Sequence, residues 1–544
     1  MTAPATSFRV VMAQLNFLVG DIAGNADKIS AAALEARDRL RADLIVFPEL
    51  TLTGYPPEDL LLRPGFIRQV EPALQRLCGE IRGIAAVIGC PLPTPEGLRN
   101  AAVMLSDGAI QGSYYKQCLP NYSVFDEKRY FVPGREPMVL TVAGARVGVT
   151  ICEDSWQSGP GVQAAKAGAQ LLLNLNASPY HAGKGGERLD VLRQRVRESG
   201  IPIVYVNLLG GQDELVFDGG SMAVGADGAL IRQAPFFSAG LYAVDFQVSE
   251  TGLRPVQGPL AQEPGPEEGI YQALVLGVRD YVQKNGFPGV VLGLSGGIDS
   301  ALTLAIAVDA LGAERVEAVL MPSRYTADMS NTDAELEAEA LGVKYHILPI
   351  EPAFQAFLQV LQPVFAGLPP DIAEENIQAR CRGVLLMAIS NKTGKMVLTT
   401  GNKSETAVGY STLYGDMAGG FAPIKDVLKT MVYRLSAYRN SLSPVIPQRV
   451  IDRPPSAELR PDQTDQDSLP PYDVLDAILR GYVEEDRSVD ELIAAGFDRA
   501  TVERVAQLVI VNEYKRRQAA PGVRITPRAF GRDRRYPITS GFRR

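Results

Sequence analysis

Residues 289–308 read GVVLGLSGGIDSALTLAIAV, a short apolar run, a turn of glycine and serine, and a long apolar run. The first run has the length of a buried strand and the second that of a buried helix. A glycine-rich turn at a helix N-terminus presents backbone N–H groups, which is a common way to bind phosphate. The stretch therefore predicts a phosphate-binding loop in an open α/β sheet.

This loop lacks the lysine of the common motif G-x-x-x-x-G-K-[ST]. If Gly296, Gly297 and the following amides hold the β and γ phosphates, the α phosphorus stays exposed, and the products are AMP and pyrophosphate. Asp299 would repel a bare phosphate, so we interpret it as a magnesium ligand. A helix N-cap would explain SGG alone, but not the whole of GLSGGIDS after a strand.

The motif SGGIDS resembles the SGGxDS loop of the ATP pyrophosphatases, which activate carbonyl-type oxygens as adenylates. Two further runs resemble the NAD synthetases among them: VLTTGNKSETAVGYSTLYGDMAGGFAPIKDVLKT at residues 397–430 and ENIQARCRGVLLMAISN from Glu375. The resemblance implies a doubly wound, Rossmann-like parallel sheet and the ATP-dependent amidation of deamido-NAD⁺.

The same resemblance assigns site residues in the second half of the chain. The implied ATP-binding residues are Gly293, Leu294, Ser295, Gly296, Gly297, Ile298, Asp299, Ser300, Thr400, Lys429 and Ser456. The implied magnesium ligands are Asp299 and Glu405, and the implied deamido-NAD⁺ contacts are Asn376, Glu405 and Lys515. One departure is Leu413, which occupies the place of a substrate-binding lysine in the ammonia-using members.

Free ammonia is mostly protonated at neutral pH, so the first half of the chain is expected to produce it from glutamine. Cys152 ends the strand-like run ARVGVTIC, where a nucleophile would face a turn and solvent. A single cysteine on a strand is more often a core residue, so the hypothesis needs a base. His181, in SPYHAG, is one candidate, whereas His346 falls in a strand pattern of the other half. Two other glutaminase designs are excluded, because no G-x-C-x-G turn surrounds Cys152 and position 2 is threonine rather than cysteine.

A carboxylate and a lysine offer another set of partners. Glu49 in FPEL, Lys116 in YYKQCLPNY and Cys152 in ICEDSW resemble the Glu-Lys-Cys set of the nitrilase, or carbon–nitrogen hydrolase, superfamily over residues 8–245. The resemblance implies an αββα sandwich. Glu49 would act as the base, with a pKa raised by partial burial. Lys116 would stabilise the oxyanion and hold Cys152 as a thiolate.

The resemblance also implies a glutamine site. Its residues would be Tyr122, Glu127, Glu153, Trp156, Ser178 and Lys184. Glu127 occupies the place where many members of the superfamily have a second glutamate that holds the lysine.

The composition predicts two globular domains. A chain of 544 residues is too long to fold around a single hydrophobic core. Its 46% hydrophobic and 21% charged residues are typical of a globular enzyme. Residues 256–269, VQGPLAQEPGPEEG, have the composition of a linker. We therefore expect a glutaminase domain at 1–255 and a synthetase domain at 270–544.

The sequence also bears on partners and location. A net charge of −8 disfavours nucleic acid and anionic membranes, although residues 515–544 carry ten basic residues and one acid. No apolar run reaches about 18 residues, and the N-terminus lacks the pattern of a signal peptide. The five scattered cysteines include no C-x-x-C pair. We expect a cytoplasmic homo-oligomer without membrane or nucleic-acid partners, and without a disulfide framework or a structural zinc site.

Taken together, these patterns predict a carbon–nitrogen ligase with two active sites. It would convert deamido-NAD⁺, ATP and L-glutamine to NAD⁺, AMP, pyrophosphate and L-glutamate, through an adenylate attacked by ammonia that crosses a water-poor tunnel. An amidotransferase for another nucleotide would share Cys152 and SGGIDS but lack GNKSETAVGYSTLYGD. A binding module in the first half would keep the fold without using the Glu-Lys-Cys set.

Overall fold

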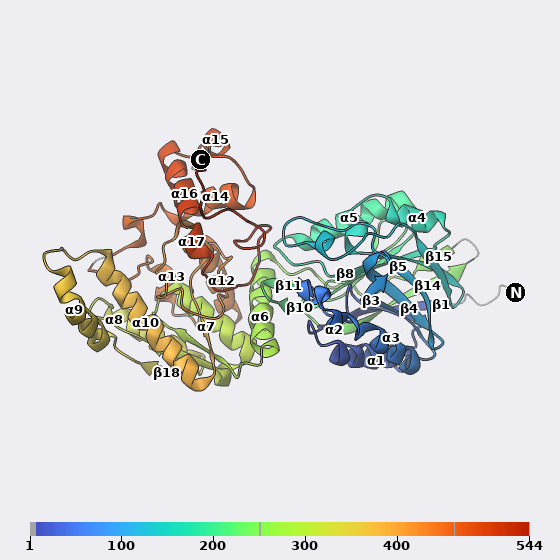
Figure 1. The fold of residues 1–544 in the computed structure, drawn as a ribbon, viewed down its shortest axis with the longest axis horizontal. Coiled ribbons are helices and arrows are strands. Elements are labelled where there is room, and N and C mark those ends of the chain that lie inside the picture. The colour runs from blue at the N-terminus through green and yellow to red at the C-terminus, as the bar shows by residue number, and fades with distance from the viewer. Residues whose placement is uncertain (1–6, 250–251, 462, 543–544) are drawn as a thin grey trace. The chain divides into compact units, whose positions relative to one another are not determined.

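The structure is a computed structural model that describes residues 7–249, 252–461 and 463–542. Two compact units are drawn in Figure 1: the first comprises Met1–Gln212 and Val216–Pro264, the second Asp213–Leu215 and Gly265–Arg544. The prediction that the N-terminus lacks a signal peptide rests in part on residues 1–6. These residues lie outside the described part of the chain. Within the described part of the chain, every helix is too short or too polar to cross a membrane.

The first unit is built on two large sheets. In spatial order, the seven-stranded sheet contains β15 (Gly252–Pro255), β14 (Gly240–Ser249), β1 (Ser7–Gln14), β2 (Leu44–Val46), β3 (Ala85–Thr94), β4 (Gly97–Ser106) and β5 (Ala109–Tyr115). The six-stranded sheet contains β13 (Leu230–Gln233), β12 (Met222–Val224), β9 (Ile203–Asn207), β8 (Leu171–Asn176), β7 (Ala145–Ile151) and β6 (Met138–Val142). The pair β10 (Leu209–Gln212) and β11 (Leu215–Asp218) forms a separate two-stranded sheet.

A hydrophobic core joins the two large sheets, and helices cover their outer faces. Val10 and Met12 of β1 are fully buried in the same cluster as Val147 of β7. The outer helices are α1 (Ile22–Asp38), α2 (Pro64–Ile67), α3 (Val70–Glu80), α4 (Pro160–Lys166) and α5 (Lys184–Ser199). Figure 1 shows α4 and α5 on one side of the strands and α1 and α3 on the other. The predicted αββα sandwich is confirmed.

Parallel strands in each sheet determine where the polar residues gather. Strands β1, β2 and β3 run parallel, as do β7, β8 and β9. Glu49 follows β2, Cys152 follows β7 and Ser178 follows β8. Because the carboxyl ends of parallel strands meet at one edge of a sheet, Cys152 and Ser178 lie on neighbouring loops. The loop of Glu49 belongs to the other sheet and reaches them where the Ala177 amide donates to Glu49 Oε2 at 3.3 Å.

The second unit contains a four-stranded parallel sheet in the order β18 (Lys344–Ile347), β17 (Val316–Leu320), β16 (Val290–Gly293), β19 (Met396–Leu398). Its helices are α6 (Pro266–Lys284), α7 (Ile298–Leu311), α8 (Asp328–Ala340), α9 (Glu351–Phe365), α10 (Ile372–Thr393), α11 (Lys403–Val408), α12 (Lys429–Leu442), α13 (Gln448–Asp452), α14 (Tyr472–Leu479), α15 (Val489–Ala494), α16 (Arg499–Val511) and α17 (Glu513–Arg516). The strand order reverses between β16 and β19, which is where open α/β sheets bind ligands. The predicted doubly wound parallel sheet is confirmed.

Candidate active sites

A buried ionic cluster in the first unit joins three of the predicted residues. The ammonium of Lys116 lies 2.7 Å from Glu49 Oε1 and 2.7 Å from Glu127 Oε1. Asn100 donates a hydrogen bond to Glu49 Oε1 at 2.7 Å. Burial lowers the pKa of Lys116, but the charges of Glu127 and Glu49 outweigh burial and raise it well above its ordinary value. Burial also raises the pKa of Glu127 to about 7, although Lys116 opposes this shift. The lysine therefore stays charged at neutral pH.

Cys152 lies directly after β7, at the start of the 3-10 turn η3 (Cys152–Ser155). Its φ of 42° is in the left-handed region, which non-glycine residues rarely adopt except where the surrounding structure holds them. Burial and the charge of Glu49 raise the pKa of this thiol well above its ordinary value, and Lys116 only partly opposes them. These surroundings favour the protonated thiol over the thiolate expected from sequence, so a base beside Cys152 would assist its reaction.

A pocket of about 640 Å³ is lined by residues that include Glu153, the residue that follows Cys152 in the chain. Two of the predicted glutamine contacts lie in it. Tyr122 and Glu153 line it, and the Tyr122 hydroxyl donates to Glu153 Oε2 at 2.9 Å. Trp156 lies beneath Lys184, whose Nζ is 4.0 Å from the ring centroid. Burial lowers the pKa of Lys184, while a hydrogen bond to Glu187 opposes that shift.

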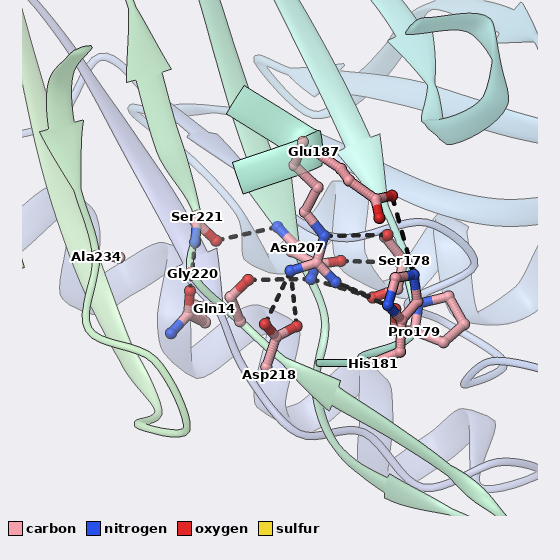
Figure 2. A network of polar contacts seen from close by, with 12 residues as sticks. Gln14, Ser178, Pro179, His181, Glu187, Asn207, Asp218, Gly220, Ser221 and Ala234 are labelled. Carbon is pink, nitrogen blue, oxygen red and sulfur yellow. Dashed lines mark hydrogen bonds and ion pairs between the residues drawn. The ribbon is translucent and has the colours of Figure 1, made fainter. Parts of the chain in front are cut away.

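The alternative base, His181, has different neighbours. Its Nδ1 lies 3.1 Å from the carbonyl oxygen of Ala182, and its Nε2 lies 3.9 Å from Glu187 (Figure 2). The second histidine, His346, is paired with Glu317 at 2.5 Å in the other unit. We favour Glu49 over His181 as the base, because the charge of Glu49 raises the pKa of Cys152 and Lys116 holds the Glu49 carboxylate at 2.7 Å.

In the second unit the predicted phosphate loop joins β16 to α7. Gly296 has a φ of 75°, and a Cβ at this position would lie 2.1 Å from the carbonyl oxygen of Ser330, so only glycine fits. Ser295 and Ser300 brace the turn: Ser300 Oγ donates to the Gly297 carbonyl at 2.9 Å, and the Gly297 amide donates to Ser295 Oγ at 3.2 Å. Gly297 is the N-cap of α7, so the helix N-terminus faces this loop.

Asp299, in the first turn of α7, is held by residues that are far away in sequence. Lys429 forms a salt bridge with Asp299 and a second with Glu405, at 3.3 Å. Asn402 donates to Asp299 Oδ1 at 2.8 Å. Burial lowers the pKa of Lys429, but Asp299 and Glu405 outweigh burial and raise it. Lys429 of α12 therefore places a cation beside a loop that has no lysine of its own.

The two carboxylates fit a magnesium ion. Burial raises the pKa of Glu405 to about 8, and the charge of Asp299 adds to this shift, so a divalent cation would favour ionisation. Within the ranges described, no group of three or more His, Cys, Asp or Glu side chains is placed to hold a metal. Magnesium commonly uses one or two carboxylates together with substrate phosphates, which is the set available here.

Two predicted deamido-NAD⁺ contacts converge on one segment, residues 409–416. Asn376 Oδ1 accepts a hydrogen bond from Thr412 Oγ1 at 2.7 Å. Lys515 Nζ donates to the carbonyl oxygens of Gly409 and Ser411 at 2.7 and 2.8 Å. The departure at Leu413 lies within the same segment, and its carbonyl accepts from Arg380. The structure therefore brings Asn376 and Lys515 to a common loop.

The remaining predicted ATP contacts are less closely grouped. Thr400 follows β19, the strand paired in parallel with β16, so it lies at the same sheet edge as the loop. Ser456 is exposed, and its hydroxyl donates to the carbonyl of Gln463 at 2.5 Å. Its segment reaches the loop through Arg453, which donates to the Gly296 carbonyl at 2.6 Å and to Ser330 Oγ at 2.9 Å.

Sequence reasoning missed several residues that hold these sites. Asp154 accepts from the amides of Ile151 and Cys118, at 3.0 and 2.8 Å, and so ties the strand before Cys152 to the segment after Lys116. Its place in EDSW, two residues after the predicted nucleophile, was the available signal. Asn100 and Arg453 carried no such local signal.

The comparisons with known proteins agree for both units. The family model described as NAD synthase matches residues 270–519, and the one described as carbon–nitrogen hydrolase matches residues 9–255. The glutamine-dependent NAD(+) synthetase of Xanthomonas campestris pv. campestris is 53% identical over 542 residues, covering 99% of this chain and 98% of the relative. That of Acinetobacter baylyi is 52% identical over 540 residues, covering 99% of each chain. A solved structure of the Acinetobacter baumannii glutamine-dependent NAD⁺ synthetase with ADP matches with a TM-score of 0.80 and 48% identity, covering 98% of this chain and 99% of that one. The chain therefore belongs to the glutamine-dependent NAD(+) synthetase family.

Proposed function

We propose that the chain makes NAD⁺ from deamido-NAD⁺, ATP and glutamine, with the ammonia produced at Cys152 and used beside Asp299. The observation that carries this proposal is the buried cluster in which Lys116 bridges Glu49 and Glu127, while Asp154 ties the segment after Lys116 to the strand before Cys152. A protonated thiol, a neighbouring carboxylate and a fixed cation are the parts that amide cleavage requires.

In the first unit, Glu49 accepts the proton of Cys152 as the sulfur attacks the side-chain carbonyl carbon of glutamine. Lys116 stabilises the oxyanion. The carbon–nitrogen bond then breaks, Glu49 returns the proton to the leaving nitrogen, and ammonia departs from a γ-glutamyl thioester. Water attacks the thioester and Glu49 takes a proton from this water. The carbon–sulfur bond then breaks, Glu49 passes the proton to the departing sulfur, and glutamate is released with Cys152 again a thiol.

In the second unit, a carboxylate oxygen of deamido-NAD⁺ attacks the α phosphorus of ATP and pyrophosphate leaves. The amides at the start of α7 and the charge of Lys429 stabilise the departing phosphates. Asp299 and Glu405 would hold magnesium, which would neutralise charge on the phosphate oxygens. Ammonia then attacks the carbonyl carbon of the adenylate, AMP leaves with the bonding electrons, and the nitrogen loses one proton to solvent. Residues 409–416, with Asn376 and Lys515, would contact deamido-NAD⁺.

One experiment tests the whole reaction. Glutamine labelled with ¹⁵N in its side-chain amide and ATP labelled with ³²P at the α position are supplied together with deamido-NAD⁺. We expect ¹⁵N in the NAD⁺ formed, equal amounts of AMP and NAD⁺, and all ³²P label in AMP. Mass spectrometry and thin-layer chromatography provide the two measurements. Label accumulating in ADP would contradict the assignment of the loop as a pyrophosphate site.

We also propose that a second copy of this chain covers an apolar face of the second unit. Residues 352–370 carry no charged side chain, and α9 buries only Phe354. Phe357, Val360 and Val364 of this helix are 49%, 75% and 72% exposed. Apolar surface of this kind marks interaction sites, and an uncharged face can meet its own copy without repulsion.

Replacing both Val360 and Val364 with glutamate is expected to convert this oligomer to a smaller species, because the charges would be buried without partners. Light scattering after gel filtration gives the mass. Replacing the exposed Leu62 of the first unit with glutamate serves as the control. An unchanged mass for the double variant would contradict the assignment of this face.

A further inference from the structure

Arg188 is a fully buried cation to which the reaction above gives no role. It lies on α5, and its side chain is 0% exposed. Nη1 donates to both carboxylate oxygens of Asp218, at 2.8 and 2.9 Å. Nε donates to Ser178 Oγ at 3.2 Å, and Nη2 donates to the carbonyls of Ser178 and Pro179 at 2.8 and 3.3 Å. A guanidinium has five N–H donors, so these five bonds use all of them.

A second side chain holds the same segment from the neighbouring strand. Asn207, the last residue of β9, accepts from the Ser178 amide at 2.9 Å and donates to the Gly219 carbonyl at 3.0 Å. The backbone N–H of Asn207 donates to Ser221 Oγ at 3.0 Å. Figure 2 shows Ser178, Asn207, Asp218 and Ser221 in this single network. The amide, carbonyl and hydroxyl of Ser178 are therefore all occupied by buried partners.

This segment continues directly into the catalytic cluster. The amide of Ala177, next to Ser178, donates to Glu49 Oε2 at 3.3 Å. The other oxygen, Oε1, is bound by Lys116 and Asn100. The direction of the Glu49 carboxylate thus depends on where residues 177–179 are held.

We propose that Arg188 is a positioning residue of the glutaminase site, where it holds residues 177–179 so that the Ala177 amide orients Glu49. The proposal rests on the function proposed above for that site. Burying an ion pair is no better for stability than burying apolar side chains of similar size, so stability alone does not explain this pair. A planar five-donor fork fixes the direction of a backbone segment in a way that a lysine cannot.

The test compares two nitrogen sources on the full chain. Arg188→Lys keeps the charge but loses the fork, and we expect kcat/KM for glutamine to fall by about 10²-fold, as for a displacement of about 1 Å in a catalytic group. The rate of NAD⁺ formation from ammonia should stay within about twofold of that of the unchanged chain, which would show that the variant is folded. Arg195→Met is the matched control: Arg195 is buried on the same helix and pairs with Glu198 at 2.8 Å, away from Ser178.

A double variant separates positioning from stability. Arg188→Met alone leaves Asp218 buried without its partner, whereas Arg188→Met/Asp218→Val removes both charges and should recover the part of the melting temperature that is lost to the unpaired Asp218. We expect this double variant to keep its ammonia-driven activity, while its kcat/KM for glutamine stays about 10²-fold below that of the unchanged chain. Recovery of both properties would show a merely structural ion pair and overturn the proposal.

The outcomes distinguish this proposal from the function on which it rests. If Arg188→Lys keeps its kcat/KM for glutamine within about twofold while Cys152→Ala loses it, only the role of Arg188 is overturned. If Cys152→Ala keeps glutamine-driven synthesis, the assignment of the glutaminase site to Cys152 itself fails. If Arg188→Lys loses activity with ammonia as well, the double variant decides: a low kcat/KM for glutamine together with normal ammonia-driven activity supports the proposal, and recovery of kcat/KM for glutamine overturns it.

Discussion

Replacing Cys152 with alanine is expected to lower glutamine-driven NAD⁺ formation by at least about 10³-fold and to leave ammonia-driven formation intact. The thiol is the group that forms the proposed γ-glutamyl thioester, so no ammonia is released from glutamine without it. Ammonia-driven formation should increase with pH, because a larger fraction of the added nitrogen is then uncharged. Initial rates with glutamine and with ammonium salt over a range of pH values provide the measurement.

The control for this prediction is Cys90→Ala. Cys90 is buried on β3 in the same unit and is 0% exposed, so its replacement produces a similar small loss of volume without touching the cluster. Both variants should lose no more than about 1–2 kcal/mol of unfolding free energy. Retained glutamine-driven synthesis in Cys152→Ala would show that another nucleophile cleaves glutamine. Loss with both nitrogen sources would show instead that Cys152 supports the structure.

Replacing Asp299 with asparagine is expected to lower NAD⁺ formation from either nitrogen source by about 10²–10³-fold, the usual cost of removing one electrostatic stabiliser. Asparagine keeps the shape of the side chain but removes the charge that pairs with Lys429 and would bind magnesium. Glutamine hydrolysis, which takes place in the other unit, should continue. Pyrophosphate release with ammonia and glutamate release without ATP give the two measurements.

Magnesium titration sharpens this result. If Asp299 is a metal ligand, the remaining activity of the variant should require a higher magnesium concentration than that of the unchanged chain. The matched control is Asp309→Asn, on the same helix, where the carboxylate pairs with Arg439 at 2.6 Å. Normal synthesis by Asp299→Asn would contradict the assignment. An unchanged magnesium dependence together with reduced activity would point to the salt bridge with Lys429 alone.

Short-range patterns in the chain were sufficient to predict both folds and the general location of both sites. The motifs around Glu49, Lys116 and Cys152 implied, by resemblance, a sandwich in the first unit, and the strand–loop–helix pattern at residues 289–308 predicted an open α/β sheet in the second. Glu49, Cys152 and the loop around Gly296 each follow a strand, and within each of their sheets the parallel strands place such positions at the carboxyl edge. The roles assigned to these residues stay predictions that the variants above test.

Tertiary structure alone decided which side chains pair and how their charges behave. Arg188 meets Asp218 thirty positions away, and Lys429 meets Asp299 across 130 positions. No periodicity in the sequence marks either pair, because each depends on how strands and helices pack. The pKa of the Cys152 thiol depends on tertiary structure for the same reason. Burial and the charge of Glu49 outweigh Lys116 there, and both desolvation and Coulomb energy are set by neighbours in space rather than in sequence.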